Sequence, residues 1–512
     1  MIERALVSVS DKQGLAEFAR GLADLGVEIV ASGGTAAYLE EMDVRVTKID
    51  EITEVPELLG GRVKTLHPNI HAGILARRDR AEDLAALREH EIRPFDLVCV
   101  NLYPFSETVA RKGVREEDAV EMIDIGGPAM LRAAAKNFAH VAPVCRPERY
   151  GEIVDELRRD GDLSHETRRA LAAEAFATTA AYEAAIASWF ADRESFPETL
   201  TRSFEKVTDL AYGENPHQRA AYYSEAGARR HLLSRVEQLH GRELSFNNLN
   251  DLSAARLLIR EFELPCAVIV KHANPCGVAL AGSIEQAYAR ALAADPVSAY
   301  GGVVVLNRPV SEELALQLSE QFVEILFAPA YDDGALETLR EKPAPRILVD
   351  EERRLDNPGE RDYRRVLGGL LVQDRDWDVE DRAGMEVVCG QPNEMTWGDL
   401  IFAWRVCKHV VSNAIVIARD LQTLGVGAGQ MSRVDAVRIA LDKAREHGHD
   451  LGGSTLASDA FFPFADGPEL ALAAGVTALI QPGGSKRDPE VIDAVTEGGG
   501  TMVFTNRRHF RH

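Results

Sequence analysis

The chain has 512 residues, of which 46% are hydrophobic and 27% are charged, and its net charge is −23 at pH 7. This length favours two to four domains of about 100–200 residues each, and the composition is that of a folded globular protein. The negative charge argues against nucleic-acid or anionic-membrane partners, because they need a basic contact surface. The longest apolar runs, such as "ALAAGVTALI", are much shorter than the roughly 20 residues that cross a bilayer.

The first residues, "MIERALVSVSDKQG", lack the charged, apolar and small-residue order of a secretory signal, so we expect a cytoplasmic protein. The six cysteines include no CxxC pair. This argues against a zinc ribbon or a redox dithiol, and it favours reduced thiols that are mostly buried.

From residue 4 to about 160, short β-branched runs such as "RALVSVS" alternate with helical patterns, which predicts a parallel sheet covered by helices. An Ala-rich helical pattern at 165–193 ends this region, and we place a domain boundary near residue 196. Beyond it, strands such as "CAVIVKH" and "TMVFTN" again alternate with helices. The charged stretch at 350–365 predicts a break between two sub-regions, although a surface loop explains it equally well.

Two short segments of the first region, "SVSDK" at 8–12 and "ASGGT" at 31–35, each follow a strand and precede a helix. Glycines, hydroxyls and free amides at a helix N-terminus bind anions, and Lys12 adds a positive charge. Each segment is equally well explained as ordinary turn chemistry. Two of them in one sheet favour a phosphate site.

Further polar groups follow in "GGRVKTLHPNIHAG" at 60–73, "NLYPF" at 101–105 and "DIGGPAMLRAAAKN" at 124–137. The first is not a Walker loop, since Val63 stands where that motif has glycine. Its histidines, His67 and His71, have metal-pair spacing, but Pro68 disfavours one helix through both. The phenol of Tyr103 could transfer protons in a closed active site. Taken alone, however, a tyrosine at a strand end is better explained as a buried structural residue.

The segment "VIVKHANPCGVA" at 268–279 brings Lys271, His272 and Cys276 close in sequence, around an expected turn at Asn274-Pro275. A metal site lacks further ligands, and Cys276 has no redox partner at CxxC spacing. A histidine after a buried strand is usually a core residue whose imidazole is hydrogen-bonded within the protein. The alternative is a base: an imidazole suits proton transfer at neutral pH, and an adjacent cation can stabilise an oxyanion.

These motifs, together with "YGENPHQ", "LSFNNLNDLSAA", "DPVSAYGG", "SNAIVIA", "GVGAGQMSR", "SDAFFPF" and "QPGGSKRD", occur in one order over nearly the whole chain. In this the chain resembles the bifunctional purine-biosynthesis family, whose N-terminal half is an IMP cyclohydrolase and whose C-terminal half is an AICAR formyltransferase. The resemblance implies an α/β protein. Its residues 1–196 would form a methylglyoxal-synthase-like parallel-sheet domain, and residues 197–512 two cytidine-deaminase-like subdomains without zinc.

The family transfers a formyl group from 10-formyltetrahydrofolate to AICAR, giving FAICAR and tetrahydrofolate, and then closes FAICAR to IMP with loss of water. No metal is required. The family is homodimeric, with the formyltransferase site at the subunit interface. For the cyclohydrolase, the resemblance makes Lys136 the proton donor or acceptor, with Lys64, Tyr103 and Asp124 around the reacting amide. The implied IMP contacts are Ser10, Asp11, Lys12, Ser32, Gly33, Gly34, Thr35, Arg62, Val63, Lys64, Thr65, Val100, Asn101, Asp124 and Ile125.

For formyl transfer, the resemblance makes His272 the proton acceptor, Lys271 the stabiliser of the transition state and Asn413 a substrate contact. The implied AICAR contacts are Tyr212, Asn248, His272, Gly301, Glu324, Asn413, Arg433 and Arg508. The implied folate contacts are Val434, Phe461, Asp466, Ser485 and Lys486. One departure concerns Ala211, because the family usually has a phosphate-binding arginine before the tyrosine of "YGENPHQ". Loss of that contact costs about 1.5–3 kcal/mol unless Arg202 or Arg219 replaces it.

Two other functions fit parts of the sequence. "GVGAGQ" at 425–430 suggests a dinucleotide-binding oxidoreductase, but Gln430 occupies the last glycine position of GxGxxG, and no clear ribose-binding acid follows. A non-catalytic nucleotide sensor is the third interpretation, since a phosphate pocket alone does not require turnover.

Overall fold

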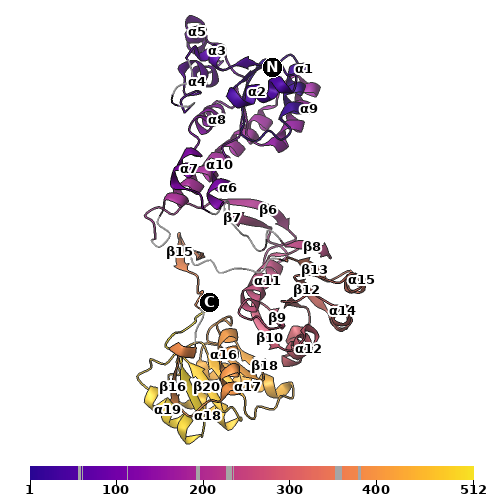
Figure 1. Ribbon diagram of the computed structural model, residues 1–512, viewed down its shortest axis with the longest axis vertical. Coiled ribbons are helices and arrows are strands. Elements are labelled where there is room, and N and C mark those ends of the chain that lie inside the picture. The colour runs from indigo at the N-terminus through magenta and orange to yellow at the C-terminus, as the bar shows by residue number, and fades with distance from the viewer. Residues whose placement is uncertain are drawn as a thin grey trace. The chain divides into compact units, whose positions relative to one another are not determined.

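The computed structural model describes residues 1–512 except 56–58, 60–61, 112, 192–195, 226–232, 234–235, 352–359 and 379–381. The chain forms two compact units, one of residues 1–205 and 225–230 and the other of residues 206–224 and 231–512 (Figure 1). Half of the stretch at 350–365 where a break was expected, residues 352–359, lies outside the described residues.

The first unit is built on a five-stranded sheet in the order β3-β2-β1-β4-β5. Every pairing between neighbouring strands is parallel, so the predicted parallel sheet is confirmed. The strands are β1 (Arg4–Ser8), β2 (Glu28–Ala31), β3 (Thr47–Lys48), β4 (Leu97–Val100) and β5 (Ala142–Val144). The helices are α1 (Leu15–Asp24), α2 (Gly33–Glu41), α3 (Asp50–Thr53), α4 (Pro68–Leu75), α5 (Ala81–Glu89), α6 (Phe105–Ala110), α7 (Glu116–Glu121), α8 (Gly126–Lys136), α9 (Tyr150–Asp160) and α10 (His165–Phe190).

The strands of this sheet are apolar on both faces because helices cover both. Along β1, Ala5 and Val7 pack into one buried cluster while Leu6 packs into another. The helices begin and end at ordinary signals: Ser164 accepts a hydrogen bond from the Thr167 N–H at the start of α10, and Gly161 ends α9 at φ 74°.

The second unit contains a twelve-stranded sheet in the order β16-β21-β20-β19-β17-β18-β10-β9-β11-β12-β13-β8. The first six strands are β16 (Glu386–Cys389), β17 (Ile415–Arg419), β18 (Gln422–Gly427), β19 (Thr455–Ser458), β20 (Ala478–Gln481) and β21 (Thr501–Phe504). The other six are β8 (Glu237–His240), β9 (Cys266–Lys271), β10 (Asn274–Leu280), β11 (Gly302–Leu306), β12 (Val323–Ala328) and β13 (Arg346–Val349). Hairpins β6 (Phe204–Leu210) with β7 (Ala220–Glu225), and β14 (Arg361–Val366) with β15 (Gly369–Asp374), form separate two-stranded sheets.

The two halves of this sheet have the same strand order when each is followed from its outer strand to the centre. From the outer strand inward, β16-β21-β20-β19-β17-β18 corresponds to β8-β13-β12-β11-β9-β10. The second unit therefore consists of two similar α/β halves, as the resemblance implied. Their helices are α11 (Phe246–Ile259), α12 (Ile284–Ala294), α13 (Pro296–Ala299), α14 (Glu312–Ser319) and α15 (Asp333–Arg340) in one half. The other half has α16 (Glu394–Cys407), α17 (Arg433–Glu446), α18 (Asp466–Ala473) and α19 (Asp488–Glu497).

The halves meet where β10 pairs with β18 in antiparallel register, with Ala279 opposite Gln422. Beside this pair, the Val278 N–H donates to the Thr423 hydroxyl over 2.9 Å, and the Leu280 N–H donates to the Leu421 carbonyl over 3.0 Å. The sheet is therefore continuous through both halves.

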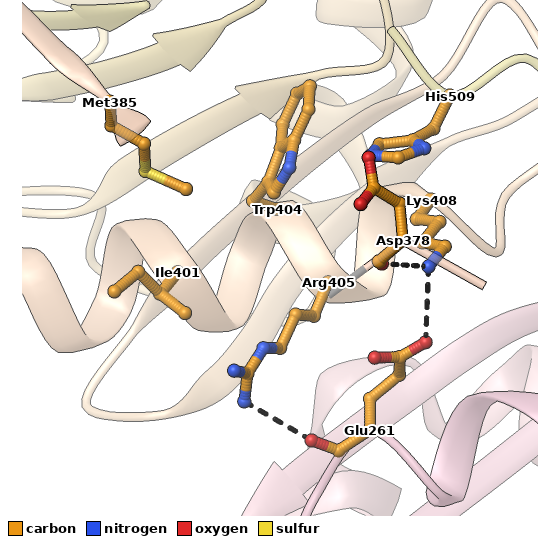
Figure 2. Close-up of a pocket in the computed structure, with 8 residues that line it drawn as sticks. All are labelled: Glu261, Asp378, Met385, Ile401, Trp404, Arg405, Lys408 and His509. Atoms are coloured by element: carbon orange, nitrogen blue, oxygen red, sulfur yellow. Dashed lines mark hydrogen bonds and ion pairs between the residues drawn. The ribbon is translucent and has the colours of Figure 1, made fainter. Parts of the chain in front are cut away.

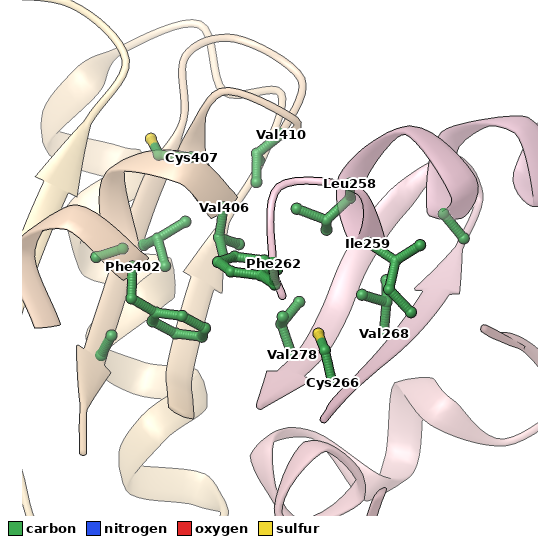
Figure 3. Packing of buried hydrophobic residues seen from close by; sticks show 14 of the residues in the cluster. Leu258, Ile259, Phe262, Cys266, Val268, Val278, Phe402, Val406, Cys407 and Val410 are labelled. Atoms are coloured by element: carbon green, nitrogen blue, oxygen red, sulfur yellow. The ribbon is translucent and has the colours of Figure 1, made fainter. Parts of the chain in front are cut away.

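One face of the long sheet is covered by α11 and α16, whose apolar side chains share a single buried cluster. Phe262, just after α11, packs against Phe402 of α16 with 5.4 Å between ring centroids. Figure 3 shows Leu258 and Ile259 on one side of this contact and Val406 and Val410 on the other. The opposite face carries separate clusters for each half.

We predict that Phe402→Ala lowers the free energy of unfolding of the second unit by about 3–5 kcal/mol, because it opens a cavity in the shared cluster. Chemical denaturation followed by tryptophan fluorescence measures this change. Leu316→Ala is the control, since that side chain is 60% exposed whereas Phe402 is 2% exposed. A cost for Phe402→Ala as small as the control's, about 0.5 kcal/mol, contradicts the role of this contact.

Candidate active sites

In the first unit, predicted site residues follow three adjacent strands. Ser10, Asp11 and Lys12 follow β1, the "SGGT" segment at 32–35 follows β2, and Asn101 follows β4. Because β2, β1 and β4 are neighbours and parallel, their carboxyl ends lie on one edge of the sheet. The structure thus brings these three motifs together.

Side-chain contacts tie the loops after these strands to one another. The Asn101 amide oxygen accepts hydrogen bonds from the N–H groups of Ser10 and Asp11, and its nitrogen donates to the Asp11 carbonyl over 3.0 Å. The Thr35 hydroxyl exchanges hydrogen bonds with the Val9 backbone, 3.1 Å in each direction. Two neighbouring loops are therefore fixed to the one after β1.

Lys12 supplies the positive charge of this edge. Its Nζ donates to the Val9 carbonyl and lies 3.3 Å from the Thr35 hydroxyl. Burial lowers the pKa of Lys12, partly offset by the charge of Asp11. An amine held this way, beside the free N–H groups at the start of α2, can neutralise an anionic group such as a phosphate.

Lys64 and Thr65 join the same edge from the segment before α4. A Cβ on Gly33 would lie 2.5 Å from the Lys64 Nζ, and a Cβ on Gly126 would lie 2.2 Å from the Thr65 hydroxyl. Glycine at both positions is what allows these side chains to approach. The amine therefore reaches the "SGGT" loop, and the hydroxyl reaches the start of α8.

Asp124 precedes α8 and accepts a hydrogen bond from the Gly127 N–H over 2.9 Å. Burial raises the pKa of Asp124, against the lowering effect of backbone N–H groups of Gly127 and Tyr103. Burial and the nearby Asp124 charge also raise the pKa of Tyr103. A carboxylate with a raised pKa beside a phenol is suited to exchanging protons with a bound amide.

Lys136 is not brought into this group. It is the last residue of α8, exposed, while Asp124 precedes the first residue of that helix. Ten residues of helix rise about 15 Å, so the length of α8 lies between Lys136 and Asp124.

The other predicted IMP contacts of this unit lie beside the gathered residues in sequence. They are Val63, Val100, Ile125 and Arg62, and the guanidinium of Arg62 forms an ion pair with Glu121.

In the second unit, the strand directions place most predicted residues on one edge of the long sheet. On that edge β9, β18, β19, β20 and β21 end, while β10, β11, β12 and β17 begin. The residues on strands, loops or helix starts at this edge are Lys271, His272, Gly301, Glu324, Asn413, Arg433, Val434, Phe461, Asp466, Ser485, Lys486 and Arg508.

The turn after β9 differs from the sequence-based expectation. Lys271 pairs with Asn274 across the hairpin, so the turn residues are His272 and Ala273, at φ 51° and 59°, and not Asn274-Pro275. Both have the left-handed conformation of a tight two-residue hairpin turn. Pro275 lies instead inside β10, and His272 occupies the tip of the hairpin.

Lys271 is held by main-chain oxygens that precede β11. Its Nζ donates to the Tyr300 carbonyl over 3.1 Å and to the Gly301 carbonyl over 2.7 Å. Gly301 has φ 66°, and a Cβ there would come within 3.1 Å of the Phe322 ring. An ammonium group has three donors, so one remains for a substrate.

Asn413 is oriented by Arg433, which is 8% exposed. The Arg433 Nη2 donates to the Asn413 amide oxygen over 2.8 Å, while Nη1 contacts Ser458 and forms an ion pair with the fully buried Asp459. The Asn413 nitrogen donates to the Gln430 carbonyl over 2.8 Å. The guanidinium of Arg433 is thus engaged in internal contacts that fix Asn413.

Tyr212 and Asn248 adjoin the same edge through the start of α11. The Phe246 N–H donates to the Tyr212 carbonyl over 3.1 Å, and the Asn248 amide lies 3.4 Å from Glu324. Glu324 also forms an ion pair of 2.6 Å with Arg346.

Sequence reasoning missed the role of Asn274. Its nitrogen donates to the His272 carbonyl over 3.2 Å, and its oxygen accepts from the Val411 N–H over 2.9 Å. It therefore links the His272 turn to the segment that carries Asn413. The asparagine was visible in the sequence, but its apparent turn role with Pro275 concealed this contact.

Comparisons with known proteins decide the family. A model described as the AICARFT/IMPCHase bienzyme matches residues 134–443, and a model of the MGS-like domain matches residues 14–129. The protein named bifunctional purine biosynthesis protein PurH from Anoxybacillus flavithermus is 50% identical over the full length of both chains. This chain belongs to the AICARFT/IMPCHase bienzyme family.

Another relative with the same printed name, from Halalkalibacterium halodurans, is 49% identical over all of both chains. A structure titled "Crystal structure of ForH" is 41% identical and covers 37% of this chain and 96% of its own, with a TM-score of 0.35. The expected family, its α/β fold and its enzyme class are confirmed by the family models and the full-length relatives. Within the part of the chain that the structure describes, no helix is long and apolar enough to cross a membrane.

Family membership opposes the oxidoreductase interpretation of "GVGAGQ", and the packing gives its glycines another role. A Cβ on Gly425 would lie 2.0 Å from the Ala440 carbonyl oxygen, and one on Gly427 would lie 2.0 Å from that of Ala436. These glycines let α17 pack closely on β18. Among the described residues, no three His, Cys, Asp or Glu side chains are grouped as metal ligands.

Two cavities of this bienzyme lie outside the predicted sites. An open groove of about 680 Å³ is lined by acidic side chains that include Glu285, Glu312 and Asp332, which repel anionic nucleotides. The other cavity, of about 10 Å³, has room for little more than a water molecule.

Figure 2 shows the small cavity beside a buried ion network between the two halves of the second unit. The Lys408 Nζ donates to the Asp378 carbonyl over 2.6 Å and lies 3.6 Å from the Glu261 carboxylate. His409 lies 3.0 Å from the same carboxylate. Burial opposes ionisation of Glu261, but the His409 hydrogen bond and the charges of His409 and Lys408 outweigh it and lower the pKa to about 2.

We predict that Glu261→Gln weakens the acid sensitivity of this unit. The ordinary pKa is 4.5, so the stabilisation from ionised Glu261 is fully present above that pH and is lost as the pH falls toward 2. Between about pH 5 and pH 2.5 the free energy of unfolding should fall by about 2–3 kcal/mol less than in the wild type. Urea denaturation at several pH values measures it. The exposed Glu337→Gln is the control, and equal slopes in Glu261→Gln and this control contradict the network's role.

Proposed function

We propose that this chain performs the last two steps of IMP synthesis on two separate sets of residues. Formyl transfer to AICAR uses the edge of the twelve-stranded sheet, and closure of FAICAR to IMP uses the edge of the five-stranded sheet. The observation that carries the proposal is the placement of Lys271, His272 and Asn413 on one sheet edge, tied together through Asn274. Residues 1–196 would hold the cyclohydrolase and residues 197–512 the formyltransferase.

In formyl transfer, the AICAR amine is a weak nucleophile because its lone pair is delocalised into the ring and the carboxamide. His272 accepts the amine proton as nitrogen attacks the formyl carbon. The remaining donor of Lys271 stabilises the oxyanion of the tetrahedral intermediate, and Asn413 orients the amine. When the intermediate collapses, the bond between the formyl carbon and N10 of the folate breaks, the proton held by His272 passes to N10, and tetrahydrofolate leaves. His272 lies at the hairpin tip and is exposed, so its imidazole can reach a ligand.

In cyclisation, the carboxamide nitrogen of FAICAR attacks the formyl carbon and water leaves. Lys64 and Tyr103 polarise the formyl oxygen, and Asp124 takes up the amide proton, for which its raised pKa is suited. Lys12 and the "SGGT" amides hold the phosphate. The role of Lys136 as proton donor or acceptor rests on the resemblance alone.

The formyl donor is of the folate type, and we propose 10-formyltetrahydrofolate. Phe461, 40% exposed after β19, offers a ring for stacking. The other folate contacts that the resemblance implies, Val434, Asp466, Ser485 and Lys486, are at the same edge of the sheet. Neither step requires a metal. We place the enzyme in the cytoplasm, without nucleic-acid or membrane partners.

The sheet itself supports a homodimer. Glu324 lies on β12, whereas the segment of Arg508 runs back to the end of β19, where the His509 N–H donates to the Asp459 carbonyl. These two strands are six positions apart, which is about 29 Å along the sheet. One AICAR molecule cannot contact both residues in one copy. Two copies that face each other along this edge would complete the AICAR site.

We predict that His272→Ala and Lys64→Ala lose different steps. His272→Ala should slow tetrahydrofolate release from AICAR and 10-formyltetrahydrofolate by about 10²–10⁴-fold, because the base is removed, and leave cyclisation of supplied FAICAR unchanged. Lys64→Ala should slow cyclisation of FAICAR and leave tetrahydrofolate release unchanged. Lys136→Ala is measured beside it, and a greater loss of cyclisation there than in Lys64→Ala would show that Lys136 is the main proton carrier. Loss of both steps in either variant contradicts separate sites, and no turnover by the wild type would favour a nucleotide sensor.

We predict that Ala211→Arg lowers the KM for AICAR about tenfold or more, because it restores a charge-assisted phosphate contact. Ala211 is exposed, and its N–H donates to the Leu244 carbonyl, so a longer side chain can be accommodated. Steady-state kinetics of formyl transfer measure the change. Ala211→Gln, similar in length but uncharged, is the control. An unchanged KM in Ala211→Arg indicates that another cation, such as Arg202 or Arg219, already binds the phosphate.

A further inference from the structure

The turn that presents His272 requires support from outside the hairpin. His272 and Ala273 both have positive φ, a conformation that costs a non-glycine residue roughly 1–2 kcal/mol. Neither is glycine, asparagine or aspartate, the residues that adopt it most easily. The strands alone therefore do not fix this turn.

Asp251 of α11 supplies that support. Its Oδ1 accepts a hydrogen bond from the Ala273 N–H over 2.7 Å, and its carboxylate also accepts from the His272 backbone. It also interacts electrostatically with the His272 imidazole and the Lys271 amine. The carboxylate thus binds both turn amides and lies near both proposed catalytic groups.

The helix that carries Asp251 is itself well fixed. Ser245 caps α11 by accepting from the Asn248 N–H, and the Asn248 side chain accepts from the Ser245 N–H in return. Asn248 and Asp251 are three residues apart, so they share one face of the helix. The proposed substrate contact and the support of the turn therefore depend on the same helix end.

In the other half of this unit, a helix aspartate also binds the two amides of a hairpin turn, but that turn carries no proposed catalytic group. Asp399 of α16 accepts hydrogen bonds from the Asp420 and Leu421 N–H groups, at 2.9 Å and 2.7 Å. Those residues have φ 52° and 59° and form the turn between β17 and β18. This turn lies on the opposite edge of the sheet, away from the predicted site residues.

We propose that Asp251 is a positioning residue for formyl transfer, which holds the His272 turn through its two amides and so places the imidazole for proton transfer. This inference rests on the proposed role of His272. Asp399 serves as the comparison for a purely structural role, because the turn that it holds carries neither an imidazole nor an amine. An asparagine at either position keeps one acceptor oxygen but turns an NH2 group toward the other N–H donor.

We expect Asp251→Asn to lower the kcat of formyl transfer by about 10- to 100-fold, because a misplaced base slows the chemical step, with the KM for AICAR within about twofold of the wild type. The matched control is Asp399→Asn, which should keep kcat within about threefold although it also loses a turn contact. Cyclisation of supplied FAICAR is measured in each full-length variant to verify folding of the first unit, and the melting temperature reports on the second.

Adding Ala273→Gly to Asp251→Asn is the rescue experiment, since glycine adopts positive φ without penalty. Partial recovery of kcat supports the positioning role. An unchanged kcat in Asp251→Asn overturns it, as does an equal loss of kcat in Asp399→Asn. If Asp251→Asn does not fold, Asp251→Glu decides, because it keeps the charge but shifts the oxygens: an unchanged kcat overturns the proposal, and a reduced kcat with normal KM supports it.

The result for His272→Ala separates this inference from the proposed function. An inactive His272→Ala beside a fully active Asp251→Asn overturns the positioning role alone. An active His272→Ala overturns the assignment of the base, and with it the inference.

Discussion

The antiparallel pairing of β10 with β18 is the contact on which the second unit depends. Each half alone has six strands with two free edges, and this pairing joins them into one sheet with a defined direction for every strand. Because the directions are fixed there, the end of β9 and the beginning of β17 lie on the same side. Residues far apart in the chain, such as His272 and Asn413, are thereby brought to one edge. The shared cluster of α11 and α16 strengthens the same junction from one face.

Sequence reasoning succeeded where a motif follows a strand directly. The segments "SVSDK" and "ASGGT" were expected after two strands of one parallel sheet, and they follow β1 and β2, whose carboxyl ends lie at one edge because the strands are parallel. It failed where tertiary contacts decide local conformation. Asn274-Pro275 is a strong local turn signal, yet the turn forms two residues earlier, since strand pairing and the carboxylate of Asp251 favour it there.

Two further features show the same limit. The resemblance implies that Lys136 acts with Asp124, but Asp124 precedes α8 and Lys136 ends it, so the length of that helix lies between them. The glycines of "GVGAGQ" looked like a nucleotide loop, whereas they allow α17 to approach β18. The close packing of α17 on β18 is a contact between two elements, which a single sequence does not display.

The way Lys271 is held has a consequence for how this enzyme can diverge. Its amine is positioned by the carbonyl oxygens of Tyr300 and Gly301, and main-chain atoms are unaffected by most substitutions. An amine held by acidic side chains would lose its position when one of those side chains was substituted. Here the surface can gain or lose carboxylates while the amine keeps its place. The requirement that remains is at position 301, where the residue must tolerate φ 66° and leave room for the Phe322 ring, which a Cβ there would approach to 3.1 Å.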